Sequence, residues 1–260
     1  MSNFAHRFRG WLVDYKWRFA PLVHMNLARR DRNTIPLTIN ITKEEVDSQL
    51  QSVLRILSSE FAPLDFHKRI PAEQRARATE LLTKHLSFAL VRKSSSLKGC
   101  GQGIFVAKGP VPALRVVALY SGTIYDPWDS ILLQSIGNHF VLRCQDGVTI
   151  DGNDVRLSRW IHRSCAYRDL SPAISDLTWL EDTPFNYLNM GHYVNNEPAP
   201  NAHNVQYVDL DIHQWPLRLR KFLPYSVYSP HRVLPLRVVV LVSVREIAEG
   251  EELFSAYVSR

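Results

Sequence analysis

The sequence predicts an α+β protein in which a helical N-terminal part precedes a β-rich part. Apolar residues recur at helical spacing on two stretches between Thr42 and about Leu90. From Gly99 onward, short runs of β-type residues alternate with turn residues. We therefore predict a helical N-terminal extension over residues 1–98 and a β-rich domain over residues 99–260.

Composition allows a sizeable core and sets weak limits on partners. Of the 260 residues, 45% are hydrophobic, and the formal net charge is +6. A modest positive charge favours acidic partners such as nucleic acid, an anionic membrane face or acidic protein tails, although a soluble basic surface explains it equally well. The longest apolar run, Val238 to Val242, is much shorter than the ~18 residues of a membrane span. We predict no membrane-spanning segment.

The cysteines predict neither a disulfide framework nor a metal site. Cys100, Cys144 and Cys165 are odd in number and widely separated, and no C-x-x-C spacing occurs. Reduced thiols fit an intracellular compartment, with the nucleus or cytoplasm as the expected location. We predict that no metal is bound.

Residues 1 to about 33 predict a basic amphipathic helix. They contain seven Lys or Arg residues against Asp14 and Asp31. Aromatic and apolar residues recur at helical spacing, namely Phe4, Phe8, Trp11, Leu12, Tyr15 and Phe19. Such a segment could be a mitochondrial presequence, a surface helix that binds an acidic partner or nucleic acid, or a helix that docks its aromatic stripe on the domain. We favour docking because Asp14 interrupts the basic pattern.

Two further helices are predicted before the β-rich part. Thr42 and Glu45 form a T-x-x-E capping box, which is typical of a helix start. The expected buried face of this helix comprises Val46, Leu50, Val53, Leu54, Leu57 and Phe61. Another helix is expected to begin at Pro71 and to continue to about Leu90. The serine-rich segment Lys93–Lys98 then reads as a linker.

The β-rich part is predicted from strand-length runs separated by turns. The runs are Ile104–Ala107, Val116–Leu119, Phe140–Arg143, Val148–Ile150, Val205–Val208 and Arg237–Val244. Asp146-Gly147 between two of them predicts a hairpin. Residues 152–190 read as a polar, part-helical insert rich in aromatic residues, and residues 211–235 as a long loop with a short helix.

Four short motifs occur in a fixed order along the β-rich part. They are Gly101-Gln102-Gly103, Tyr120-Ser121-Gly122, Asn195-Asn196-Glu197-Pro198-Ala199-Pro200-Asn201 and the run from Gly250-Glu251-Glu252-Leu253 to Tyr257. The first is not followed by a βαβ unit, which argues against a dinucleotide-binding fingerprint. Each motif alone is weak, but the ordered set resembles the SET domain family of protein lysine methyltransferases. This resemblance implies a β-rich SET fold of small sheets with a knot-like C-terminal crossing.

The resemblance also implies a binding site for the cofactor S-adenosyl-L-methionine. Gly101, Gln102 and Gly103 would let the backbone lie close against the cofactor. Asn195 would hydrogen-bond the amino acid moiety of the cofactor. Asn196 takes the place of the family histidine and would keep its backbone contacts to adenine.

The catalytic and substrate-channel residues follow from the second and fourth motifs. By resemblance, Tyr257 supplies the key hydroxyl and also contacts the cofactor. Tyr120 and Gly122 shape the boundary between the cofactor and the substrate lysine, and Tyr120 is counted with the catalytic residues. Ser255 takes the place of an aromatic residue that limits how many methyl groups fit around the lysine nitrogen.

The predicted activity is therefore methyl transfer to a lysine of a protein substrate. Many family members complete the lysine channel with a cysteine-rich segment after the fourth motif, whereas three residues follow Tyr257 here. We expect the cover to come from the insert around Trp160–Tyr187, from the Tyr225–Tyr228 loop or from a partner. The alternative is a SET-fold interaction module without turnover, because Asn196, Glu197, Pro198, Ser255 and Ala256 depart from the family motifs.

Overall fold

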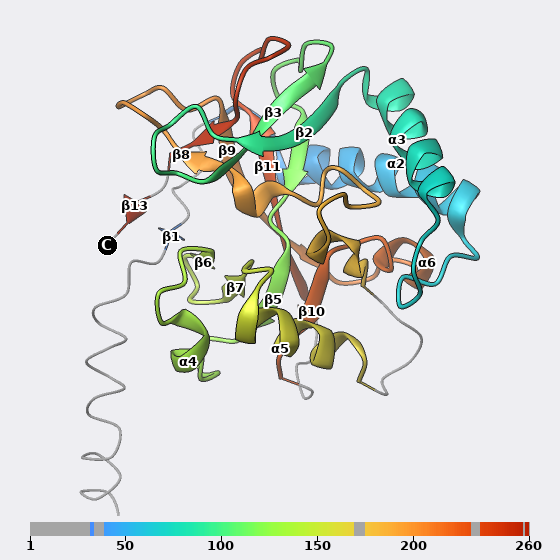
Figure 1. Cartoon of the computed structure of the whole chain (residues 1–260), viewed down its shortest axis with the longest axis vertical. Coiled ribbons are helices and arrows are strands. Elements are labelled where there is room, and N and C mark those ends of the chain that lie inside the picture. The colour runs from blue at the N-terminus through green and yellow to red at the C-terminus, as the bar shows by residue number, and fades with distance from the viewer. Residues whose placement is uncertain (1–31, 34–38, 169–174, 230–234, 257, 260) are drawn as a thin grey trace, which may run out of the picture.

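The computed structural model describes residues 32–33, 39–168, 175–229, 235–256 and 258–259. In Figure 1 the helices α2 and α3 lie along one side of a β-rich body, while α4 and α5 lie at its lower end. Of the helix predicted for residues 1–33, only Arg32–Asn33 belongs to the described part of the chain, where it forms the short strand β1.

The elements of the described part follow one another in this order: β1 (Arg32–Asn33), α2 (Lys43–Phe61), α3 (Ala72–Leu86), β2 (Ala89–Ser94), β3 (Gln102–Lys108), β4 (Val116–Leu119), β5 (Gly122–Tyr125), α4 (Leu132–Ser135), β6 (Val141–Arg143), β7 (Thr149–Asp151), α5 (Arg156–Ala166), the 3-10 helices η1 (Leu177–Leu180) and η2 (Gly191–Tyr193), β8 (Asn195–Asn196), β9 (Val205–Ile212), α6 (Leu217–Arg220), β10 (Tyr225–Val227), β11 (Leu236–Ser243), β12 (Phe254–Ser255) and β13 (Val258–Ser259).

The strands form three small sheets, as the α+β prediction requires. The largest has the order β10-β5-β7-β6-β1-β13, the second has the order β4-β11-β9-β12-β8, and β2 pairs with β3 alone. In the second sheet the late strand β12 lies between β9 and β8 and runs parallel to both. This insertion brings the C-terminal motif next to the Asn195 motif.

The helix predicted at Thr42 is confirmed. In α2 the Thr42 side chain accepts a hydrogen bond from the Glu45 backbone, and the Glu45 side chain accepts one from the Thr42 backbone. These two bonds satisfy backbone groups that a helix start otherwise leaves open. All six apolar residues of the predicted face are buried.

The next helix is shorter than predicted. α3 begins after Pro71 and ends at Leu86, where Ser87 adopts a left-handed conformation with φ of 66°. Residues 89–94 then form β2, which pairs antiparallel with β3. The expected helix end near Leu90 was therefore wrong, and of the expected linker Lys93–Lys98 the first two residues belong to β2 while residues 95–98 form the turn that follows it. The left-handed Ser87 ends the helix, and pairing with β3 turns the following residues into a strand.

The six predicted strands are confirmed with shifts of a few residues at their ends. The predicted hairpin joins β6 to β7, and Gly147 in its turn has φ of 89°, a conformation that glycine adopts easily. The sequence did not reveal β5, β10, β8 or β12. β5 and β10 pair with each other in parallel, so their partners lie far away along the chain.

One hydrophobic core joins the helical and β-rich parts. It contains the buried face of α2, Leu82 of α3, the strands β4 and β11, and Leu253 near the C-terminus. The division into residues 1–98 and 99–260 stays a prediction, because the shared core belongs to both parts.

Candidate functional site

The first and third motifs meet in space although 92 positions separate Gly103 from Asn195. Nδ2 of Asn195, at the start of β8, donates a hydrogen bond to the backbone oxygen of Gln102 in β3, at 3.0 Å. A Cβ placed on Gly103 would lie 3.3 Å from the same nitrogen and would collide with the carboxylate of Glu252. A side chain at Gly103 would therefore displace the Glu252 carboxylate from its present position.

Gly101 differs from Gly103 in its surroundings. It has φ of 69°, which strains residues with a side chain, and it is exposed. A Cβ at Gly101 would have no heavy atom of the described residues within 4 Å. The first glycine therefore borders open space, and the second packs against the fourth motif.

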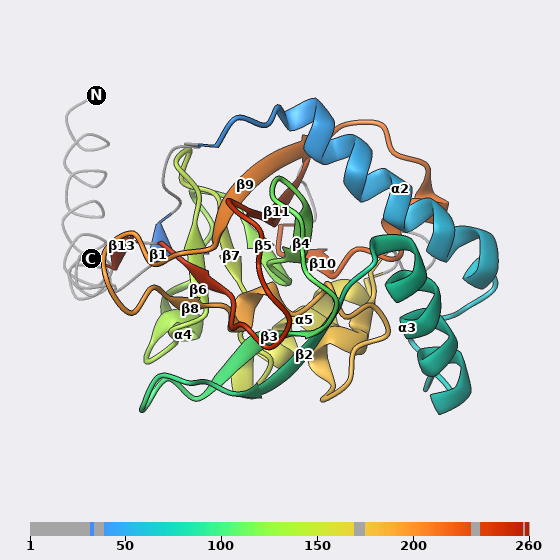
Figure 2. The same cartoon turned by 90° about the horizontal axis from the view of Figure 1, so that it is seen from above.

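The fourth motif reaches the same place through strand pairing. β12 pairs parallel with β8, so that Phe254 lies beside Asn195 and Ser255 beside Asn196. Figure 2 shows β3 and β8 close together in the same part of the molecule. Three of the four predicted motifs thus converge in the described structure.

Glu252 is the centre of this convergence, a role that sequence analysis did not assign. Its Oε1 accepts hydrogen bonds from Ser95 Oγ at 2.7 Å and from Asn195 Nδ2 at 3.3 Å. Its Oε2 accepts hydrogen bonds from the backbone N–H of Ser96 at 2.8 Å and from the Ser96 hydroxyl. Burial raises the pKa of Glu252, but the hydrogen bonds from Ser96, Ser95 and Asn195 together hold it below its ordinary value. The carboxylate is ionised.

Tyr120 and Gly122 lie at the turn between β4 and β5. Tyr120 is fully buried, and its hydroxyl donates a hydrogen bond to the backbone oxygen of Phe140 at 2.8 Å. A Cβ on Gly122 would collide with the backbone oxygen of Asp151. Glycine is needed here because the neighbouring strand β7 passes so closely.

Tyr207 links Tyr120 to Ser255, and no motif of the sequence marked it as a site residue. The rings of Tyr120 and Tyr207 meet edge to face with centroids 6.0 Å apart. The buried Ser255 hydroxyl donates a hydrogen bond to the Tyr207 hydroxyl at 3.2 Å. The predicted channel residues Tyr120 and Ser255 therefore belong to one packed group. Tyr257 lies outside the described residues, so its role stays a prediction.

The insert packs behind this region through a buried histidine. Nε2 of His162 in α5 accepts a hydrogen bond from the Trp179 indole N–H at 3.1 Å. Its Nδ1 lies 3.0 Å from the Thr123 hydroxyl in β5 and 2.9 Å from the Ser226 hydroxyl in β10. Complete burial lowers the pKa of His162 to about 3, so the ring is neutral. The part-helical insert is thus anchored against the strand that follows Tyr120-Ser121-Gly122.

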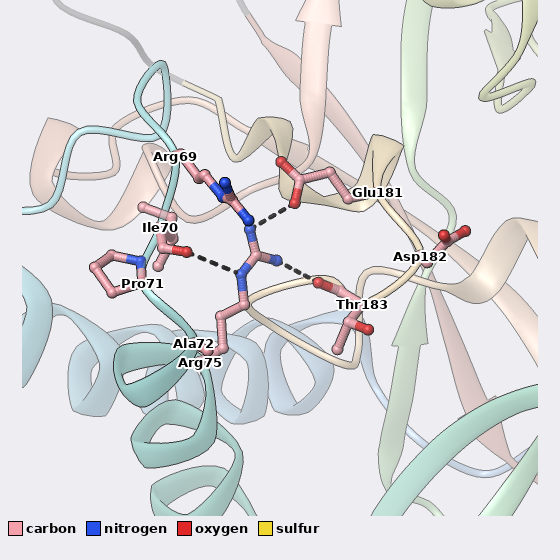
Figure 3. A pocket seen from close by; sticks show the side chains of 8 residues that line it. All are labelled: Arg69, Ile70, Pro71, Ala72, Arg75, Glu181, Asp182 and Thr183. Atoms are coloured by element: carbon pink, nitrogen blue, oxygen red, sulfur yellow. Dashed lines mark hydrogen bonds and ion pairs between the residues drawn. The ribbon is translucent and has the colours of Figure 1, made fainter.

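The far end of the insert is fastened to α3. Figure 3 shows the guanidinium of Arg75 between Ile70, Glu181 and Thr183. Arg75 pairs with Glu181 at 2.6 Å and donates hydrogen bonds to the backbone oxygens of Ile70, at 3.3 Å, and Thr183. The cavity beside them has a volume of about 590 Å³ and is lined by none of the predicted site residues. We assign these contacts to packing of the insert.

The expectations of no bound metal and no membrane span can be compared only with the described residues. In the part of the chain that the structure describes, no group of three or more His, Cys, Asp or Glu side chains could hold a metal ion. Over the same residues, the helices are too short or too polar to cross a membrane. Cys100, Cys144 and Cys165 are free thiols.

Comparison with solved structures gives only distant likenesses. CpSET8 from Cryptosporidium is 12% identical, with 96% of this chain and 95% of that chain covered and a TM-score of 0.36. The Polycomb Repressive Complex 2 of Chaetomium thermophilum, in an autoinhibited conformation bound to S-adenosylmethionine, is 16% identical over 68% of this chain and 16% of that chain, with a TM-score of 0.36. TM-scores this low carry no weight for the activity of this protein.

Comparison with known protein sequences identifies the family of this chain. No family model matches the chain. SET domain-containing protein 9 of Homo sapiens is 38% identical over 281 residues, which cover 94% of this chain and 93% of the human protein. The protein of the same name from Pongo abelii is 41% identical over 238 residues, covering 90% of this chain and 86% of its own length. With such identity along nearly the whole length, and with three of the four motifs meeting at Glu252, the chain belongs to the SET domain-containing protein 9 family.

Proposed function

We propose that this protein transfers a methyl group from S-adenosylmethionine to a lysine of a protein substrate. The observation that carries the proposal is the meeting of Gly103, Asn195 and Glu252, which come from three motifs of the SET domain. These residues lie far apart along the chain, so their contact in the fold supports a common site.

The residues at this site fit the amino acid end of the methyl donor. Gly101 borders open space, where the backbone can approach a ligand without an intervening side chain. The side-chain oxygen of Asn195 and the carboxylate of Glu252 are hydrogen-bond acceptors of the kind that an ammonium requires. When bound, the donor supplies a methyl group made electrophilic by the positive sulfonium.

The lysine must reach the site as a neutral amine, although the pKa of a free lysine is about 10.4. The buried rings of Tyr120 and Tyr207 form apolar surroundings that disfavour an ammonium ion. The positive sulfonium lowers the pKa of the amine further. The proton can leave through solvent before the methyl group is attacked, so no strong general base is needed.

The protein then chiefly aligns nitrogen, methyl and sulfur along one line. We assign the key aligning hydroxyl to Tyr257, on the family resemblance. Ser255 is small where the family carries an aromatic residue, which leaves more room around the amine. The number of methyl groups added is therefore a property to be measured on the product.

Two measurements test this function. Isothermal titration should show that the folded protein binds S-adenosylmethionine, and labelled methyl transfer into a cell lysate should mark at least one protein. Tyr257→Phe should lower turnover about 100-fold, the scale expected when one preorganised polar group is lost. Tyr167→Phe, which removes the hydroxyl of an exposed tyrosine, is the matched control and should not change turnover.

A different outcome would favour the interaction module without turnover. Folded protein that binds no methyl donor would contradict the enzyme function. Unchanged turnover in Tyr257→Phe would instead contradict only the role of that hydroxyl. Asn195→Ala should raise the dissociation constant for the donor, because the amide that connects Gln102 to Glu252 is lost.

A further inference from the structure

The carboxylate of Glu252 is a buried charge held by neutral groups. The residue is only 4% exposed. Its partners are the hydroxyls of Ser95 and Ser96, the Ser96 backbone N–H and the Asn195 amide. Within the described part of the chain, no Lys, Arg or His forms an ion pair with Glu252.

The ionised carboxylate of Glu252 is stabilised by hydrogen bonds alone, because no Lys, Arg or His of the described residues pairs with it. These neutral donors offset the desolvation of the carboxylate but supply no positive charge to neutralise it. The preceding residue shows the contrast, because Glu251 pairs with the guanidinium of Arg245. The negative charge of Glu252 is therefore suited to binding a ligand that carries a positive charge.

The position of the carboxylate identifies which cation fits. Oε1 of Glu252 touches the place where Gly103 lacks a side chain, and it lies 3.3 Å from Nδ2 of Asn195. Asn195 is the residue assigned to the amino acid end of the methyl donor, and Gly103 belongs to the motif assigned to the cofactor. That end carries an α-ammonium group, which has three N–H donors and a full positive charge.

We propose that Glu252 binds the α-ammonium group of the methyl donor, with Ser95 and Ser96 holding the carboxylate in place. The inference rests on the proposed function and adds a donor-binding residue to it. The two serines belong to the segment before the first glycine motif, so donor binding would also order the approach to Gly101. A carboxylate that accepts hydrogen bonds from an ammonium forms a charge-assisted pair, about twice as strong as a neutral one.

The test compares three ligands that differ at the amino acid end. S-adenosylmethionine and S-adenosylhomocysteine both carry the ammonium, whereas methylthioadenosine lacks the whole amino acid. Titration of Glu252→Gln should show affinity reduced about 10-fold or more for the first two ligands, as expected for loss of a charge-assisted pair. Affinity for methylthioadenosine should be unchanged.

The controls separate this inference from the proposed function. Glu246→Gln removes an exposed carboxylate six positions earlier and should bind all three ligands like the natural protein. If the natural protein binds S-adenosylmethionine and Glu252→Gln binds it equally well, the inference fails alone. An equal loss for methylthioadenosine would also overturn it, since the effect would then not concern the ammonium. If the natural protein binds none of the ligands, the proposed function fails and the inference falls with it.

A measurement on the natural protein covers the case in which Glu252→Gln does not fold. S-adenosylhomocysteine is compared with its analogue in which the amino group is replaced by hydrogen. The analogue should bind about 10-fold more weakly or worse, because it cannot form the charge-assisted bond. Equal affinity of the two ligands would overturn the inference.

Discussion

Two buried charged residues of this protein differ in their partners: one forms ion pairs and the other accepts hydrogen bonds from neutral groups. Arg237 in β11 is 5% exposed, and Glu252 is 4% exposed. Arg237 pairs with Asp211 at 2.8 Å, Asp146 at 2.7 Å and Asp209 at 3.6 Å. Glu252 receives hydrogen bonds from serine and asparagine groups and forms no ion pair within the described residues.

The difference indicates that the charge of Arg237 stabilises the fold, whereas we propose that the charge of Glu252 binds a ligand. Asp211 lies directly opposite Arg237 on the neighbouring strand β9, so the pair belongs to the sheet. Burial lowers the pKa of Arg237, but the hydrogen bonds with Asp211 and Asp146 hold it above its ordinary value. The charges are matched within the chain, whereas at Glu252 the missing charge is the one that the proposed ligand brings.

The largest effect on stability is expected when Arg237 is removed from its ion pairs with Asp146, Asp209 and Asp211. Arg237→Met should lower the free energy of unfolding by about 3 kcal/mol, because it leaves three neighbouring carboxylates without their cation. Urea denaturation at pH 7 measures this loss. Arg245→Met is the control, since its pair with Glu251 is half exposed and should contribute less than about 1 kcal/mol. Equal losses in the two variants would show that burial of the Arg237 group does not matter.

A second effect on stability is expected at His162, a buried side chain that is neutral in the fold. Burial lowers its pKa in the fold to about 3, whereas the ordinary pKa of an exposed histidine is 6.5. Because the unfolded chain takes up a proton first, the stability contributed by His162 is complete above pH 6.5 and is lost as the pH falls toward 3. Between about pH 6.5 and about pH 5 the loss should be about 2 kcal/mol.

His162→Gln isolates this contribution, because glutamine cannot take up a proton. The difference in unfolding free energy between the natural protein and the variant should shrink as the pH falls from about 6.5 to about 5. Other titrating groups, such as the buried Asp176 with its pKa raised to about 6, cancel in this difference. A difference that stays constant over this range would mean that His162 does not remain neutral in the fold.

The features that could be predicted from the sequence depend on neighbours along the chain. The capping box of Thr42 and Glu45 spans three positions, and the hairpin at Asp146-Gly147 spans a few more. The strands β4 and β11 could also be predicted, since both are buried along their whole length and therefore appear as apolar runs in the sequence. Local chemistry determines these elements, so their residues were sufficient to find them.

The part that the sequence could not reveal depends on partners far away. Ser95 and Ser96 resemble a linker because serine is common in loops, and their partner Glu252 lies more than 150 positions later. β2 was hidden for the same reason, since its polar residues become a strand only by pairing with β3. Family resemblance placed Gly103 and Asn195 at a common site, but only the folded chain shows that Glu252 joins them.

The smallest effect on stability is expected at Glu252 itself. Glu252→Gln should change the free energy of unfolding of the ligand-free protein by only about 1 kcal/mol, because one amide oxygen still accepts hydrogen bonds and the burial of a charge is relieved. Urea denaturation without ligand measures this change beside Arg237→Met. Adding S-adenosylmethionine should then stabilise the natural protein more than the variant, since the stabilisation by a ligand grows with its affinity for the fold. A ligand-free loss as large as that of Arg237→Met would mean that both buried charges serve the fold, and the contrast between them would disappear.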